Sequence, residues 1–183
     1  MLSVTNRKGF TLIEVMVVAG IIAILAGILV PMIFNQVDES RKTKALADCK
    51  SIQTAIMTFR KDTGAWPNKI NPTTASISML NGAGTNLPDA DYTSKSFDVT
   101  ARQNYMDHLK TDDNSAYGTL WKGPYMTMVE ADPWGNAYIT NSNNFDTNPP
   151  APVWVMSAGP DGKLDTAATS DTLQNDDIGI RIK

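Results

Sequence analysis

Cysteine and histidine are nearly absent from this chain, because Cys49 and His108 are the single representatives of their types among 183 residues. One cysteine excludes an intrachain disulfide and any zinc or iron–sulfur site built from cysteines. One histidine excludes a histidine-rich metal site. A Ser-His-Asp triad would have to use His108, and the sequence has no nucleophile-elbow pattern. We therefore expect no enzyme, and we predict that His108 lies at the surface.

Acidic residues slightly outnumber basic ones in the sequence, with 19 Asp and Glu against 16 Lys and Arg. The formal net charge is −3, and the loss of Arg7 and Lys8 would make the chain more acidic by two charges. No basic patch of the kind that binds nucleic acid would remain. We therefore expect no nucleic-acid partner.

A long hydrophobic run is present only near the N-terminus. Residues 15–34 carry no charge and span about the 20 residues that a helix needs to cross a hydrocarbon core. Arg7 and Lys8 precede this run, and short basic flanks tend to stay in the cytoplasm. We therefore expect a single-pass membrane protein with its N-terminus inside and its C-terminal domain outside.

Gly9 lies between the basic residues and the hydrophobic run. An ordinary secretory signal has its small-residue cleavage site after the apolar segment. Cleavage after Gly9 would instead remove residues 1–9 as a basic leader and keep the apolar helix. The order of these features predicts a membrane anchor that remains in the mature protein.

Glu14 is a carboxylate at the start of the apolar segment, where a charge costs about 2.5–3.5 kcal/mol on insertion scales. Glu14 could extend toward the lipid headgroups in a lone subunit. Alternatively, it could neutralise the new amino group of Phe10 in a neighbouring copy, where both charges would otherwise be buried without partners. We favour the second interpretation.

The octapeptide KGFTLIEV, residues 8–15, resembles the class III signal of type IV pilins and pseudopilins. The resemblance implies that a prepilin peptidase cuts between Gly9 and Phe10 and N-methylates Phe10, and that Glu14 is the acidic residue of the motif. Pro31 cannot donate a backbone hydrogen bond and should kink or loosen the helix. In related filaments this proline belongs to a region that melts on assembly, although an ordinary kink remains open here.

The helical pattern continues beyond the membrane segment (residues 10–34) into an amphipathic segment, residues 35–64. Gly64 is placed to end this helix. Its opposite face is mostly basic. The apolar stripe recurs at steps of three and four residues and consists of Ala45, Cys49, Ile52, Ile56 and Phe59. We expect this stripe, including a buried Cys49, to pack against the rest of the chain.

Residues 65–183 should form the outer globular domain. Residues 68–122 are rich in small polar side chains and predict a long variable loop, with a short helix over residues 101–109. Two β-rich runs, residues 123–140 and 152–157, predict strands of a small antiparallel sheet that covers the helix stripe. The expected fold class is α+β, a pilin-like fold with a long N-terminal helix packed on this sheet and a C-terminal loop.

The segment DPWGNAY, residues 132–138, resembles the major pseudopilin of type II secretion systems. Locally, Trp134 should be a core aromatic and Gly135-Asn136 a turn. This resemblance identifies a subfamily and not a mechanism.

The C-terminal loop, residues 157–178, contains clustered carboxylates separated by glycine turns. Such oxygen ligands suit a hard cation, although an EF-hand is not matched and a solvated acidic loop is the alternative. In major pseudopilins the corresponding loop holds a structural Ca²⁺, so the resemblance implies one here. The implied ligands are the side chains of Asp161, Asp176 and Asp177 and the carbonyls of Ala158 and Lys163, with Asp165 as a further candidate.

Taken together, the resemblance implies a structural subunit, the major pseudopilin, that polymerises into a periplasmic filament driving type II protein secretion. It implies a bacterial inner-membrane location and several partners: further copies of the chain, minor pseudopilins, the prepilin peptidase, an inner-membrane platform and, through it, an assembly ATPase. A type IV pilin for attachment, motility or DNA uptake is one alternative. A membrane-tethered calcium-dependent binding domain is another, but it leaves Gly9, Phe10 and Glu14 unexplained.

Overall fold

The computed structural model describes residues 9–72, 77–83, 87–88 and 92–183. The chain divides into two compact units, Met1–Ser40 and Arg41–Lys183. The predicted leader, apart from Gly9, lies outside the described residues. The two units differ in how their side chains are packed.

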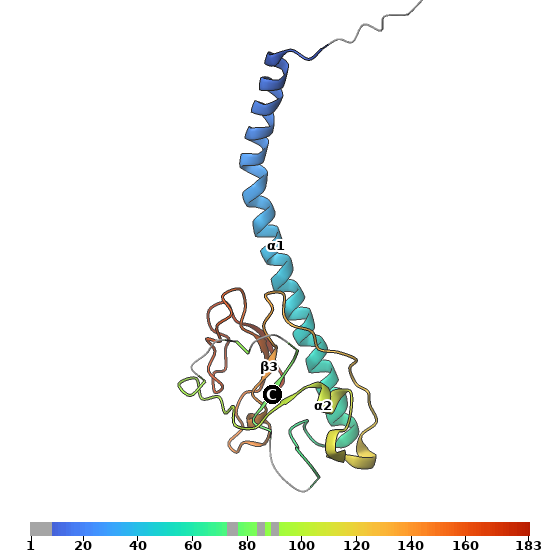
Figure 1. The fold of residues 1–183 in the computed structure, drawn as a ribbon. Helices are drawn as coiled ribbons and strands as arrows, with labels where there is room; N and C mark the ends of the chain where they lie inside the picture. The colour runs from blue at the N-terminus through green and yellow to red at the C-terminus, as the bar shows by residue number, and fades with distance from the viewer. Residues whose placement is uncertain (1–8, 73–76, 84–86, 89–91) are drawn as a thin grey trace, which may run out of the picture. The chain divides into compact units, whose positions relative to one another are not determined.

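The long helix α1, Leu12–Thr63, begins and ends within two residues of the helix that the sequence predicts (Figure 1). It continues through Pro31, and Gly64 ends it with a positive φ of 70° and an N–H bond to the carbonyl of Arg60. Every described residue of the first unit is exposed. Among described residues, α1 is the one helix long and apolar enough to cross a membrane, with a mean hydropathy of 2.8 over its most apolar window.

The predicted stripe on the second half of α1 is buried. Five stripe residues are at most 1% exposed, and Ala55 and Thr63 extend the buried face. Cys49 is therefore a core residue, as expected. The core that these side chains enter also contains Leu80 and Val155 from the sheet and Tyr138, which directly precedes the strand Ile139–Thr140.

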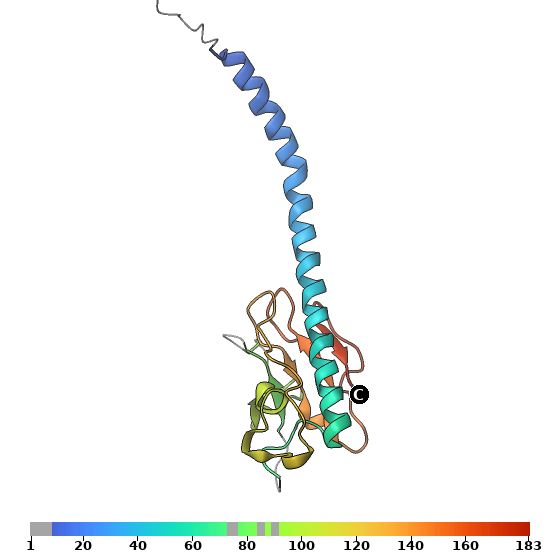
Figure 2. The same ribbon diagram turned by 90° about the vertical axis from the view of Figure 1, so that its right-hand side faces the viewer.

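A five-stranded sheet packs against this half of α1 (Figure 2). The strand order is β2-β1-β3-β4-β5, and the strands are β1 Met79–Asn81, β2 Arg102–Asn104, β3 Ile139–Thr140, β4 Trp154–Ser157 and β5 Ile178–Arg181. The pilin-like α+β class is thereby confirmed. The sheet is mixed and not wholly antiparallel as predicted, because β1 and β2 run parallel while the other pairs are antiparallel.

The segment predicted as a long loop, residues 68–122, contains more regular structure than expected. It supplies β1 and β2, the short helix α2 (Met106–Leu109) and two 3₁₀ turns. The helix expected over residues 101–109 is wrong in its first half, because Arg102–Asn104 pairs with β1 instead. Of the β-rich run predicted at residues 123–140, only Ile139–Thr140 forms a strand. The first part is not a strand, and the N–H groups of Tyr125 and Met126 both donate to the carbonyl of Leu109.

Side chains of α1 bind β5 at the edge of the sheet. Gln53 Nε2 donates to the carbonyl oxygen of Arg181 over 2.8 Å, and Cys49 Sγ lies 3.9 Å from the carbonyl oxygen of Ile178. These two side chains are one helical turn apart, so they reach carbonyls three residues apart on the strand. The contacts fix β5 on the helix and thereby position the loop between β4 and β5.

His108 is buried, which contradicts the predicted surface position. Its side chain is 1% exposed, and its ring meets the Tyr117 ring edge-on at a centroid distance of 5.9 Å. Neither ring nitrogen has a hydrogen-bond partner among the described residues. Burial lowers the pKa of His108 to about 4, partly opposed by the charge of Asp113, so the ring is neutral near pH 7.

Candidate functional site

The candidate site is the loop that joins β4 to β5. Gly159 has a φ of 67°, and a side chain at this position would clash with the carbonyl oxygen of Asp176. Glycine is therefore required at this position for two reasons: its positive φ and the close approach of the two ends of the loop. This approach brings together acidic residues that are about 15 positions apart in the sequence.

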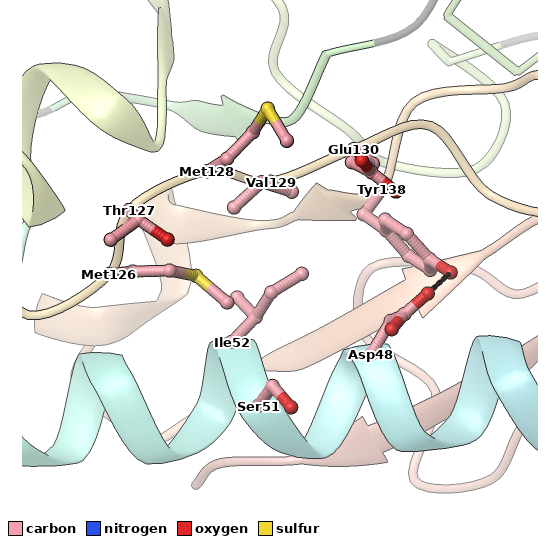
Figure 3. Close-up of a pocket in the computed structure, with 9 residues that line it drawn as sticks. All are labelled: Asp48, Ser51, Ile52, Met126, Thr127, Met128, Val129, Glu130 and Tyr138. Atoms are coloured by element: carbon pink, nitrogen blue, oxygen red, sulfur yellow. Dashed lines mark hydrogen bonds between the residues drawn. The ribbon is translucent and has the colours of Figure 1, made fainter.

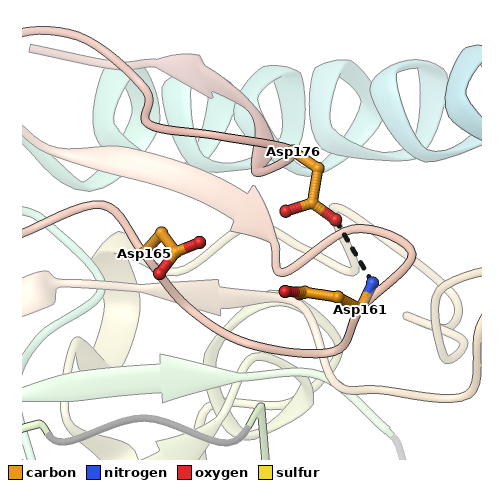
Figure 4. A group of neighbouring side chains, drawn as sticks. All are labelled: Asp161, Asp165 and Asp176. Atoms are coloured by element: carbon orange, nitrogen blue, oxygen red, sulfur yellow. Dashed lines mark hydrogen bonds between the residues drawn. The ribbon is translucent and has the colours of Figure 1, made fainter.

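Three carboxylates meet where the loop closes (Figure 4). Asp161, Asp165 and Asp176 each place one oxygen within 4.8 Å of the others, and Asp161 is exposed while the other two are half-buried. The backbone N–H of Asp161 donates to Oδ2 of Asp176 over 3.2 Å, and the N–H of Lys163 donates to Oδ1 of Asp161 over 2.8 Å. The structure thus brings together three of the predicted ligand side chains.

Asp165 has neighbours that partly balance its charge. The ammonium of Lys95 lies 3.8 Å from its Oδ1 and also donates to its backbone carbonyl. The side-chain amide of Asn175 donates to Oδ2 over 2.6 Å. Of the three carboxylates, Asp165 therefore has the most hydrogen-bonding and ionic support from the chain itself.

Asp177 faces the backbone of the loop. Its Oδ2 accepts the N–H groups of Asp165 and Thr166 over 3.0 and 2.6 Å. Its Oδ1 is buried and has no partner among the described residues. Burial raises the pKa of this carboxyl above its usual range, although the bonds from Thr166 and Asp165 lower it. Asp177 thus lies outside the group of three, and it orders the loop backbone while retaining an unpaired buried oxygen.

The chemistry of the cluster suits a cation with oxygen ligands. Three carboxylates at this separation repel one another unless positive charge or protons compensate them. All three offer hard oxygen ligands, and the unpaired Oδ1 of Asp177 is a further acceptor close by in the sequence. The cluster could therefore hold a metal ion. The ligand roles of Asp177 and of the carbonyls of Ala158, which is buried, and Lys163, which is exposed, stay predictions.

A buried aspartate connects this loop to the preceding turn. Asp132 accepts the N–H groups of Trp134 and Asn136 through Oδ1 and the hydroxyl of Ser157 through Oδ2, over 2.6–3.0 Å. The predicted turn at Gly135-Asn136 is present, with a Gly135 φ of 95°. Trp134 is half-buried at the margin of the core and not fully enclosed.

Sequence reasoning missed the contributions of Asp132, Lys95 and Asn175 to this region. An aspartate before a Pro-Trp-Gly-Asn turn is an available signal, because Asp side chains often accept backbone N–H groups two residues on. Lys95 lies 70 residues from Asp165, and no local pattern could reveal that contact.

At the other end of the chain, Thr11 and Glu14 cap the first turn of α1. Glu14 Oε2 accepts the N–H and the hydroxyl of Thr11, each over 2.8 Å, and the Glu14 N–H donates back to the Thr11 hydroxyl over 3.3 Å. This reciprocal arrangement is a capping box. Gly9 and Phe10 precede the helix and are exposed. A cut between them would leave α1 intact.

Two family profiles match the chain. The Prokaryotic N-terminal methylation motif matches residues 4–30, and the family described as Type II secretion system (T2SS), protein G matches residues 91–176. The first match covers the capping box and most of the apolar segment. The second covers the three clustered carboxylates. No solved structure matches the chain significantly.

Curated relatives match over most of their length. Type II secretion system core protein G of Escherichia coli K12 is 29% identical over 163 residues, which are 88% of this chain and 87% of the relative. Core protein G of Pseudomonas aeruginosa is 27% identical, covering 86% and 87%, and that of Aeromonas hydrophila is 26% identical, covering 95% and 92%. These matches, the methylation motif and the pilin-like fold together identify the chain as a relative of the type II secretion system core protein G.

Proposed function

We propose that this chain is the major pseudopilin of a type II secretion system, a structural subunit that polymerises into a periplasmic filament. The observation that carries the proposal is that one chain combines the methylation motif, an exposed apolar helix and a protein G domain. The relatives are named Type II secretion system core protein G, and the chain matches 87% of the length of each. A role in filament assembly explains why every described side chain of the apolar helix segment is exposed.

Processing would convert the precursor into the assembly-competent form. A prepilin peptidase would cut between Gly9 and Phe10 and methylate the new amino group of Phe10. The capping box gives Glu14 a partner within its own chain before assembly. In the filament, Glu14 would exchange these bonds for the amino group of Phe10 in a neighbouring copy, and Pro31 would mark the part of α1 that loosens.

Orientation follows from the basic leader. Arg7 and Lys8 would remain in the cytoplasm, and the second unit would lie in the periplasm. The apolar part of α1 would first lie in the inner membrane and then in the filament core. Minor pseudopilins, the inner-membrane platform and, indirectly, its assembly ATPase would be partners of this step.

A structural Ca²⁺ would complete the acidic loop. Asp161, Asp165 and Asp176 would supply carboxylate oxygens, and Asp177 and the carbonyls of Ala158 and Lys163 would be further ligands. A bound divalent cation would offset the repulsion among the carboxylates and join the two ends of the loop. With a site of the extracellular kind, the dissociation constant would be about 0.1–1 mM.

The assembly role is tested by intact mass and filament recovery. The full chain is expressed together with a prepilin peptidase and the rest of a type II secretion machinery, and sheared filaments are collected. We expect a chain that lacks residues 1–9 and carries one extra methyl group, and filaments built from it. Gly9→Leu should remain a precursor and give no filaments. Mature chain that never assembles would contradict the proposal.

Calcium binding is tested separately by titration calorimetry on the full chain in detergent. Asp161→Asn should abolish binding, because it removes one of the three clustered charges. Asp171→Asn is the matched control, since Asp171 is an exposed aspartate of the same loop that pairs with Arg181 instead. Equal calcium binding by wild type and Asp161→Asn would exclude Asp161 as a ligand. No calcium binding by wild type would remove calcium from the proposal, and neither result would affect the assembly role.

A further inference from the structure

A groove of about 200 Å³ lies between α1 and the extended segment that precedes β3 (Figure 3). Asp48, Ser51 and Ile52 line it from α1. Met126–Glu130 and Tyr138 line the opposite side. The groove belongs entirely to the second unit and has no part in the acidic loop.

One end of the groove is acidic. The Tyr138 hydroxyl donates to Oδ2 of Asp48 over 2.9 Å, which fixes the carboxylate in the wall, and Figure 3 shows Glu130 toward the same end. Asp48 and Glu130 form no ion pair with any described lysine or arginine. This end therefore offers negative charge to a cation from outside the chain.

The other end of the groove is apolar. Ile52 forms its floor, and Figure 3 shows Met126 beside the Ile52 end. Met128 also lines the groove and is 57% exposed, and Figure 3 shows its side chain pointing away from α1. Methionine side chains adapt to irregular partners, so these walls suit an aliphatic side chain.

The opposite face of α1 carries a matching pair of side chains. At about 100° per residue, Lys42 lies about 120° and Leu46 about 160° around the helix from Asp48. Lys42 is exposed and forms no ion pair with any described residue, and Leu46 is 37% exposed. Because of this separation, Lys42 cannot reach Asp48 of its own chain.

We propose that the groove receives the Lys42–Leu46 face of α1 from a second copy of this chain. A parallel copy shifted by six residues, about 9 Å along the helix axis, brings its Lys42 level with Asp48. The same shift brings its Leu46 level with Ile52. One displacement thus matches the cation with the acidic end and the aliphatic side chain with the apolar end.

A second copy is the occupant because both halves of the contact lie on one helix. An interface between different faces of identical chains is heterologous, and its repetition generates an open helical array. The inference rests on the proposed filament role and adds a specific contact between neighbouring subunits.

Charge reversal in the full chain tests the contact. Expressed alone with the secretion machinery, Asp48→Lys and Lys42→Asp should each lower filament recovery by at least about tenfold, because like charges then meet at every repeat. Expressed together, the two variants should restore filaments, because each groove then receives the opposite charge. Each variant chain carries the same charges whether it is expressed alone or with the other variant. Co-expression would therefore not repair a defect inside the subunit.

Lys44→Asp is the matched control, because Lys44 is an exposed lysine on the same face of α1 as Asp48. Its co-expression with Asp48→Lys should not restore filaments. Restoration by Lys44→Asp, or no restoration by Lys42→Asp while wild type assembles, would overturn the proposal. Failure of the wild type to assemble would instead overturn the proposed function, and this inference with it.

A cysteine cross-link keeps all charges and does not depend on the folding of the reversed variants. Leu46→Cys in one copy and Met128→Cys in another should give a disulfide-linked pair in wild-type-like filaments. Met57→Cys, an exposed methionine elsewhere on α1, replaces Leu46→Cys in the control and should give none. Filaments without the first cross-link would contradict the proposed contact.

Discussion

The helix–sheet core and the acidic loop of the second unit are stabilised in opposite ways. In the core, α1 buries an apolar stripe against strands, and Phe59 meets the rings of Tyr117 and Tyr125 at 4.7 and 5.4 Å. In the loop, carboxylates accept backbone N–H groups and lie close to one another. The core needs nothing beyond the chain, whereas the loop gathers charge that a cation would balance.

This difference separates two kinds of stability in one small unit. Apolar burial contributes about 25 cal/mol per Å² and depends little on ions. Clustered carboxylates gain stability only when something offsets their repulsion. We therefore expect core variants to lower the free energy of unfolding equally with and without calcium. Loop variants should lower it only when calcium is present.

The largest effect should come from Phe59→Ala. Phe59 is fully buried, so its removal should lower the free energy of unfolding by about 3–5 kcal/mol. Chemical denaturation of the full chain in detergent measures the loss, with calcium and with a chelator. Met57→Ala, at an exposed position two residues away, should change stability by less than about 0.5 kcal/mol. If the stability lost in Phe59→Ala depended on calcium, the core and the acidic loop would not be stabilised independently.

Acid should weaken the core through His108. Its pKa falls from 6.5 to about 4 on folding, so the folded chain binds fewer protons than the unfolded chain. The contribution of neutral His108 to the free energy of unfolding is fully present above pH 6.5. This contribution, about 2–4 kcal/mol, is lost as the pH falls from 6.5 toward 4. The measurement compares the pH dependence of unfolding in wild type and His108→Phe, which keeps a ring against Tyr117. Parallel curves for the two proteins would count against this account.

Asp132→Ala tests the connection between the two regions. The carboxylate accepts three hydrogen bonds while 4% exposed, so its loss should lower the free energy of unfolding by about 2 kcal/mol. Because Ser157 precedes the acidic loop, calcium affinity should fall as well. An unchanged affinity would mean that the loop is built independently of the turn.

The smallest effect should come from Asp161→Asn. Without calcium the exposed position should matter little, whereas calcium at ten times its dissociation constant should stabilise wild type by about 1.4 kcal/mol. Thermal unfolding should therefore show a calcium-dependent shift in wild type and in Asp171→Asn, and none in Asp161→Asn. A shift that survives Asp161→Asn would exclude Asp161 as a ligand.

The sequence predicted α1 well because its information is local. Ala45 to Phe59 repeat at helical spacing, Gly64 supplies the C-terminal stop, and the structure contains both features. The strands β1, β2 and β5 were not predicted, and each pairs with a segment that is distant in the sequence. A short polar run such as Arg102–Asn104 has no periodicity that separates a strand from a loop.

The candidate site was predictable in composition and not in arrangement. The acidic residues and glycine turns of the loop are visible in the sequence, and Asp161 and Asp176 do meet. Their approach across residues 166–174 depends on the pairing of β4 with β5. For the same reason the sequence could not show that Asp165 joins the cluster while Asp177 turns to the backbone.

His108 shows how a polar neighbourhood in the sequence can mislead. Most residues around it in the sequence are polar, yet its side chain on α2 is buried and its ring meets the Tyr117 ring edge-on. The aromatic partner lies nine residues further along the chain and belongs to no regular sequence pattern.

Hydrogen–deuterium exchange of the full chain, with calcium and with a chelator, compares the two regions most directly. The account predicts that calcium slows exchange at the amides of Asp161, Lys163, Asp165 and Thr166, while amides of α1 after Arg41 and of β4 exchange at unchanged rates. No change in the loop, or an equal change in the core, would contradict the division between a self-sufficient apolar core and a loop completed by a cation.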